Sequence, residues 1–244
     1  MIGFFRRIRR KMANENKFVQ YSRYAIGEIV LVMVGILLAL QVNNWSENIK
    51  RETLEISTLK ELKENIQQDI EDMKVNLLYY KTSSQSARII AEALENRTPY
   101  HDSLQQHFGK VSLTPLFLPT KSAYDNLQNG SGTQLISNDS LRKGLQKLYD
   151  VGYVLMIKVA DLDQETSKQE IAKMYQKVMS EYASGVYALP VDYNSLFENQ
   201  EFKNMITQQM NERDNHFIPL AEAIIQNQRD MLQRLDNELL IRKK

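Results

Sequence analysis

The chain has 244 residues, of which 43% are hydrophobic and 25% charged, with a formal net charge of +1. This composition is ordinary for a folded protein and excludes a disordered or low-complexity chain. The absence of cysteine excludes disulfide bonds, thiolate metal sites and thiol catalysis.

Charge is distributed unevenly along the chain. Residues 1–24 carry seven basic side chains and one acidic side chain, whereas residues 46–244 carry 24 basic and 28 acidic ones. The basic residues therefore gather at one end, beside the most apolar stretch. A short basic segment in this place suits anionic lipid head groups better than nucleic acid, so we expect no nucleic-acid partner.

The basic leader, residues 1–24, begins with the letters MIGFFRRIRRKM. Its Phe5, Ile8 and Met12 fall at helical spacing with arginines between them, a pattern typical of a short amphipathic helix lying on a membrane surface. The same letters also suit a plain topology signal in an unstructured tail. The sequence leaves both interpretations open.

Residues 25–42 form an apolar run whose one charged residue is Glu28. As a helix the run would extend roughly 27 Å, close to the hydrocarbon thickness of a bilayer. Tyr21, Tyr24 and Trp45 flank it, where amphipathic rings prefer the membrane interface. We predict an uncleaved transmembrane signal anchor. A cleaved signal peptide is disfavoured by the long leader and the long run, and a buried core helix by the adjoining charge.

The basic residues before the run place the N-terminus in the cytoplasm. Residues 46–244 would then form the periplasmic domain of a single-pass inner-membrane protein, because no second run of this length and apolarity follows.

Small residues within the predicted span share one helix face. They are Gly27, Gly35 and Ala39, with Glu28 at the edge of the face. Small residues let a second helix approach closely, so these four residues are the candidate contact with a partner span or a second copy. Two plainer readings stay open. Glycine and alanine are common in membrane helices, and Glu28 could be a boundary residue that reaches the head groups.

Glycine and proline divide the outer region into three long stretches with helical periodicity, 47–96, 138–182 and 195–242. The first is compatible with a helix that continues directly from the span. It keeps a seven-residue apolar repeat typical of long helices packed together. The repeat comprises Ile66, Ile70, Met73, Leu77, Tyr80, Ser84, Ala87, Ala91 and Leu94.

In the second stretch Ser137 is the predicted N-cap, and Ile136 and Leu141 stand at the positions of a hydrophobic staple. Gly152 occupies a heptad position and indicates a close helix approach. The predicted core stripe comprises Leu141, Leu145, Leu148, Leu155, Val159 and Leu162.

The third stretch begins with SLFE, a capping-box pattern in which Ser195 is the cap and Glu198 reaches back. Pro219 should kink this helix or divide it. The predicted core stripe comprises Ile206, Met210, Phe217, Leu220, Ile224, Met231 and Leu235.

These elements predict an all-α fold. An N-terminal transmembrane helix is followed by a long antiparallel bundle of three helices, or by a four-helix-like bundle. The insertion 97–136 is too long and too apolar for a bare turn, so we expect it to form short helices at the distal tip of the bundle.

Two stretches carry a resemblance: YAIGEIVLVMVGILLALQVNNW across the predicted span, and SAYDNLQNGSGTQLISNDSLRKGLQKLY in mid-chain. They are similar to an uncharacterised family of single-span membrane proteins common in Bacteroidota, a domain of unknown function. Its members resemble this chain along nearly the whole length, and share a mid-chain pattern Y..L...G...LI.N..LR. That pattern is filled here by Tyr124, Leu127, Ile136, Asn138, Leu141 and Arg142. The resemblance implies the same architecture and brings no established activity.

No catalytic constellation is visible in the sequence. His101 and His107 are six residues apart, a poor helical spacing for sharing a metal, and His216 with Glu212 suits a surface hydrogen bond. The letters NGSG at 129–132 lack the following Lys and the preceding strand of a phosphate loop. We therefore expect no enzyme activity, no metal and no cofactor.

We expect a membrane-anchored periplasmic scaffold or interaction protein, whose partners are the bilayer and another protein or a second copy. Two alternatives stay open. A sensory input module could use the same bundle, although it would need a separate signalling partner. An accessory single-span subunit of a proton-driven complex would account for the acidic Glu28 in the span.

Overall fold

The computed structural model describes residues 18–242. The chain divides into two compact units, one ending at Leu54 and the other beginning at Glu55. The amphipathic helix predicted from Phe5, Ile8 and Met12 lies outside the described residues.

The first unit consists of the N-terminal part of helix α2 (Phe18–Glu95), which runs without interruption from the predicted span into the second unit. Among the described residues, α2 is the one helix long and apolar enough to cross a membrane. None of its most apolar window is buried against protein, and Leu31 exposes 71% of its surface. Apolar side chains with no protein packing are expected of a helix that faces lipid.

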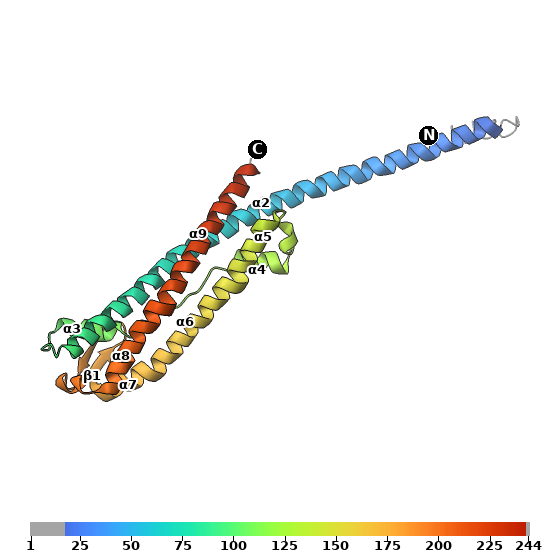
Figure 1. The fold of residues 1–244 in the computed structure, drawn as a ribbon. Helices are drawn as coiled ribbons and strands as arrows, with labels where there is room; N and C mark the ends of the chain where they lie inside the picture. The colour runs from blue at the N-terminus through green and yellow to red at the C-terminus, as the bar shows by residue number, and fades with distance from the viewer. Residues whose placement is uncertain (1–17, 243–244) are drawn as a thin grey trace. The chain divides into compact units, whose positions relative to one another are not determined.

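The second unit is almost entirely helical and contains three long helical rows that lie side by side (Figure 1). The first row is α2 from Glu55 onwards. The second row comprises α5 (Asp139–Gln146), the π-helical η2 (Lys147–Tyr153), α6 (Val154–Thr166), the π-helical η3 (Ser167–Ile171) and α7 (Ala172–Val178). The third row comprises α8 (Gln200–Glu212), the π-helical η5 (Arg213–Phe217) and α9 (Ile218–Ile241). The predicted all-α bundle is confirmed.

Short elements join the rows. They are α3 (Ser103–Lys110), α4 (Ser122–Asn129), the 3-10 turn η1 (Thr133–Leu135), the strands β1 (Met179–Ala183) and β2 (Tyr187–Pro190), and the 3-10 turn η4 (Asn194–Phe197). The first three confirm the expectation of short helices in 97–136. Their predicted place at the distal tip is wrong for α4 and η1, which lie near the other end of the bundle (Figure 1), where Asn65 bonds to Ser122 and Glu55 to Ser137. Pro219 stands in the first turn of α9, directly after η5, so the third row is divided where proline predicted.

The segment between α3 and α4 runs back along α2. Asn76 donates its side-chain N–H to the carbonyl of Leu116 (3.0 Å), and the carboxylate of Asp69 accepts the backbone N–H of Thr120 (2.6 Å). Phe117 between them is buried in the bundle. Part of 97–136 therefore packs along the first row, because side chains of α2 satisfy its backbone.

Two helix starts differ from prediction, the first because a tertiary contact takes the predicted cap. The N-cap of α5 is Asn138, whose side chain accepts the N–H of Leu141 (3.1 Å), while the N–H and hydroxyl of Ser137 donate to Glu55 (2.6 and 2.8 Å). The capping box of Ser195 and Glu198 is also wrong. Helix α8 begins later, at Gln200, and its N-cap is Asn199, whose side chain accepts the N–H of Phe202 (2.9 Å).

A two-stranded antiparallel hairpin replaces the end of the second predicted helix, which stops at Val178 instead of Tyr182. Gly185 closes the turn with φ of +77°, a conformation that favours glycine. The hairpin packs on α3, where a Cβ added to Gly109 would lie 2.2 Å from the backbone nitrogen of Tyr187. Contact between segments 78 residues apart in the chain therefore ends the helix.

The core stripe of the second row shifts by one position at η2. Leu141, Leu145 and Leu148 are buried as predicted. Beyond η2, however, Leu155 and Leu162 are 48% and 63% exposed, so their assignment to the core is wrong, whereas Val159 is half-buried and packs against the core. A π-helical turn holds one residue more than an α-helical turn, which rotates every following side chain.

The remaining core predictions are confirmed, except that two predicted residues in each outer row are only half-buried. In α2, Leu77 is half-buried and packs against the core, and Ala91 is half-buried beside the fully buried Ile90. In the third row Met210 and Leu220 are half-buried, whereas the other predicted stripe residues are buried. The close approach predicted at Gly152 is present.

Candidate functional site

The predicted contact face of the span is open. No atom lies within 4 Å of a Cβ added to Gly27 or Gly35, and Ala39 is exposed. Glu28 is half-buried at the edge of this face. The first unit therefore leaves room for a second helix along these four residues, and their role as a contact stays a prediction.

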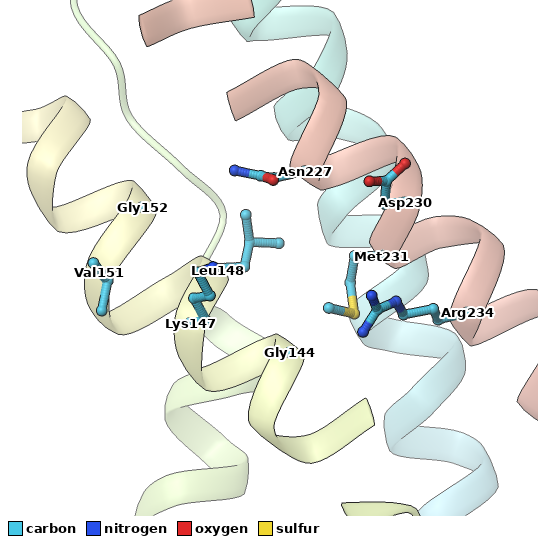
Figure 2. Close-up of a pocket in the computed structure, with 9 residues that line it drawn as sticks. All are labelled: Gly144, Lys147, Leu148, Val151, Gly152, Asn227, Asp230, Met231 and Arg234. Atoms are coloured by element: carbon cyan, nitrogen blue, oxygen red, sulfur yellow. The ribbon is translucent and has the colours of Figure 1, made fainter. Parts of the chain in front are cut away.

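A surface groove of about 250 Å³ lies in the second unit, between α5–η2 and α9 (Figure 2). Figure 2 shows Met231 and Arg234 of α9 beside Gly144. A Cβ added to Gly144 would lie 2.6 Å from the methyl carbon of Met231, and one added to Gly152 would lie 3.2 Å from Ile224. The two glycines therefore allow the two helical rows to approach closely at the groove.

The groove walls carry charges of both signs: Lys147, Arg234 and Asp230. Asp230 already accepts a hydrogen bond from Gln226 (2.8 Å). No side chain that is both buried and unpartnered lines this groove. Its lining therefore selects no particular class of small ligand.

A polar layer separates two hydrophobic cores in the second unit. The first core includes Tyr80, Met156 and Phe217, and the second includes Ala87 and Ile171. Each helical row places buried polar residues between its members of the two cores. This layer comprises Ser83, Ser84, Ser86, Asp163, Ser167, Gln209 and Arg213.

The centre of the polar layer is an ion pair between Arg213 and Asp163 (2.5 Å), whose side chains are 1% and 4% exposed. The guanidinium also lies over the rings of Tyr80 (5.4 Å) and Phe217 (4.7 Å). Burial raises the pKa of Asp163, and the charge of Arg213 offsets only part of that rise.

Several atoms of the polar layer have no hydrogen-bond partner among the described residues. They are Oδ2 of Asp163, Oγ of Ser167, Oε1 of Gln209 and Nε of Arg213. Unpaired buried polar atoms are costly, so the layer is less well satisfied than the rest of the interior.

A second buried acid lies in the first core. Asp69 is 2% exposed, and burial raises its pKa even though the N–H of Thr120 and the hydroxyl of Tyr153 act in the opposite direction. Tyr153 in turn accepts a hydrogen bond from Gln228 (3.1 Å). Oδ2 of Asp69 has no geometrically good partner among the described residues. No cation contributes to this environment.

A third network joins the ends of the three rows at Glu55. The Glu55 carboxylate is 2% exposed and accepts from Arg242 (2.9 Å) and from Ser137. Arg242 also pairs with Glu238 (2.7 Å), which accepts from the side chain of Asn138 (2.7 Å). Burial opposes ionisation of Glu238, but these hydrogen bonds outweigh it and lower its pKa.

The histidines do not assemble a catalytic site within the described residues. His107 lies 3.2 Å from the hydroxyl of Ser86, and burial lowers its pKa. Ser86 is inside helix α2, where backbone N–H groups are already used and cannot form an oxyanion hole. His101 bonds to Ser103, and His216 lies 3.9 Å from Glu212 at the surface. No group of three potential metal ligands occurs in the part of the chain that the structure describes.

Sequence reasoning missed Asp69, Asp163 and Arg213, because a charged residue on a long helix is usually solvated. One signal was present. Gln209 and Arg213 continue, at four-residue spacing, a line of core positions that ends at Phe217 and Ala221. The letters NGSG at 129–132 end α4 and form a turn, in which Gly132 has φ of +74°.

A search of curated proteins and a search of solved structures found no match to this chain. A family model described as a family of unknown function, DUF6090, matches residues 28–214, from the edge of the span face to the polar layer. The match covers about three quarters of the 244 residues. The chain therefore belongs to the family of unknown function DUF6090.

Proposed function

We propose that this protein is a membrane-anchored scaffold, held by the apolar part of α2 and presenting its helical unit to a partner protein in the periplasm. One observation carries the proposal. The apolar stretch of α2 buries none of its side chains against protein, whereas the second unit closes around its own cores. An exposed apolar helix on a self-contained unit is what an anchor on a functional domain requires.

The surface of the second unit supports recognition of a protein. The groove beside Gly144 is one open feature of this surface, and a larger one of about 790 Å³ lies between α7 and α8. Met174 and Met205 line the larger groove together with amide and charged side chains. Both methionines are buried (5% and 7% exposed), so the amide and charged side chains form the accessible surface of this groove and suit a polar contact with a polypeptide.

The orientation rests on charge. Seven basic residues precede the apolar run, and the segment that follows it is balanced. Basic residues are retained in the cytoplasm, so the helical unit belongs on the other side of the membrane. The partner is then another periplasmic or inner-membrane protein.

Co-purification tests this function. The tagged full chain is cross-linked in membranes, purified in detergent, and compared with a control in which residues 25–42 are replaced by an unrelated transmembrane helix. A scaffold acting through its helical unit retains the same partner in the control. A partner lost in the control is bound through the span. Recovery of no protein beyond those in a mock purification contradicts the proposal.

The identity of the partner separates the alternatives. A sensory input module would co-purify with a membrane protein that has a cytoplasmic output domain. A subunit of a proton-driven complex would co-purify with a multi-span protein, and the Glu28→Gln variant would assemble with it but fail to support its activity.

A further inference from the structure

Helix α6 carries two apolar faces that are one residue apart. The sequence continues the heptad of Leu141, Leu145 and Leu148 without a break through Gly152, Leu155, Val159 and Leu162. A regular α-helix would bury this face along its whole length.

The structure buries the other face. Beyond η2 the buried residues are Tyr153, Met156, Ala160 and Asp163. Leu155 and Leu162 are exposed instead, and Val151 within η2 is 59% exposed. The π-helical segment η2 produces this choice, because its extra residue turns the following helix by about 100° relative to a continuous α-helix.

The unused face is the more hydrophobic of the two. It offers Leu155, Leu162 and the half-buried Val159, which already packs against the core, where the buried face offers Met156, Ala160 and Asp163. The observed register also leaves Oδ2 of Asp163 without a hydrogen-bond partner in the described part of the chain. Burial of two leucines favours the unused register, while the Asp163–Arg213 ion pair favours the observed one.

Helix α6 lies between two π-helical segments. η2 ends at Tyr153 and η3 begins at Ser167, so the thirteen residues of α6 are bounded by an irregular turn on each side. Because η3 is π-helical and already holds one extra residue, a second one that moves there from η2 would give η3 two, rotate α6 alone and leave α5 and α7 in place.

We propose that α6 is a two-register element, in which transfer of the extra residue from η2 to η3 rotates the helix. The rotation exchanges Met156, Ala160 and Asp163 for Leu155 and Leu162 in the core and buries the half-buried Val159 completely. The exchange separates Asp163 from Arg213 and so opens the polar layer between the two cores. Burial of the leucines and formation of the Asp163–Arg213 ion pair favour different registers, and a packed helix with two such arrangements can be bistable. The proposal is independent of the partner that the scaffold binds.

Thiol labelling of the full chain in detergent tests the two registers, since the protein has no cysteine of its own. Met156→Cys places one thiol on the buried face, where it reacts only when α6 rotates. Deletion of Val151 removes the extra residue from η2 and makes the observed face continuous with an ordinary α-helix. We expect Met156→Cys to react at least tenfold more slowly in the deletion background.

A point substitution can also block the second register, without a change in chain length. Leu162→Asp is a surface change in the observed register but buries a carboxylate in the other one, so it should slow labelling of Met156→Cys at least tenfold. Leu240→Asp is the matched control, because Leu240 is 60% exposed on α9, and it should leave the rate unchanged.

Leu145→Cys reports global unfolding, because Leu145 is buried before η2 and keeps its place in both registers. If Leu145→Cys becomes reactive when Val151 is deleted, the deletion has unfolded the protein. The labelling rates of Met156→Cys with and without Leu162→Asp then test the two registers alone. Equal labelling rates of Met156→Cys with and without Leu162→Asp overturn the proposal. So does a Met156→Cys rate that equals the Leu145→Cys rate, since labelling would then report unfolding.

Discussion

At the scale of single residues, the interior of the helical unit is defined by charges that few bundles bury. Arg213 and Asp163 come from different rows, and they form an ion pair in which both side chains are buried. Their contribution to folding therefore depends on whether one or both are removed.

Removal of Arg213 alone should be severely destabilising. Arg213→Met leaves the Asp163 carboxylate buried without a cation, which costs about 3–5 kcal/mol of unfolding free energy. The double variant Arg213→Met, Asp163→Leu removes both charges and should be more stable than Arg213→Met. Urea unfolding of the purified chain, followed by circular dichroism, measures the difference. A double variant as unstable as the sum of both single variants would mean that the pair is not coupled.

Asp69 should make stability depend on pH. Its pKa is raised in the folded state, so the folded protein holds this proton more tightly than the unfolded chain does. Its contribution is therefore fully present below the unfolded value of 3.8 and is lost as pH rises through the folded pKa. Asp69→Asn keeps an acceptor for Thr120 and removes the titration.

The comparison is made between pH 4 and pH 8 by urea unfolding of both proteins. The stability of Asp69→Asn relative to the wild type should increase with pH across the window above 3.8. A difference between the two proteins that stays constant with pH would show that Asp69 has an ordinary pKa in the folded protein.

At the scale of elements, the seven-residue repeat predicted the three rows but not every register. Leu145 and Ile224 were identified correctly because an unbroken repeat connects them to their neighbours. Leu155 and Leu162 were wrongly assigned to the core, because no residue type marks a π-helical turn in a sequence. Asn138 and the hairpin at Gly185 depend on Glu55 and Gly109, which lie far away in the sequence. Local patterns therefore identified elements, and long-range contacts decided their ends.

Alanine substitutions should distinguish the predicted core residues from the observed ones by the unfolding free energy that each substitution costs. Leu145→Ala and Ile224→Ala should each cost roughly 2–5 kcal/mol of unfolding free energy, because both side chains are buried. Leu155→Ala should cost less than about 1 kcal/mol, because almost half of its surface is exposed. Thermal or urea unfolding of the four purified proteins provides the measurement. A large loss at Leu155 would place the continuous heptad face in the core.

The span face makes a separate prediction. Gly35→Leu fills the open side of the helix and should reduce cross-linking of the span to a second copy or to a partner, because close backbone approach is lost. Leu37→Met, two residues further on and on another side of the helix, is the control. Cross-linking in membranes that is equal for both variants would remove Gly27, Gly35 and Ala39 from consideration.

At the scale of the whole molecule, charge and apolarity are segregated along the chain. The basic leader, the apolar run and the slightly acidic helical unit follow one another in sequence. Glu55, the first residue of the second unit, holds the ends of all three rows through Arg242 and Ser137. Twelve residues, 43–54, separate Val42, at the end of the apolar run, from Glu55 in the sequence.

The proposed orientation in the membrane rests on the same segregation. If the seven basic residues keep the N-terminus inside, an alkaline phosphatase reporter fused after Lys244 should be active, and a cytoplasm-dependent fluorescent reporter in the same place should be dark. Protease added to spheroplasts should digest the helical unit. Replacing Arg6, Arg7, Arg9, Arg10 and Lys11 by glutamine removes most of the retention signal and should give a mixed orientation. An active fluorescent reporter and a protease-protected unit in the unmodified protein would mean that the orientation is reversed, and the partner would then have to be sought in the cytoplasm.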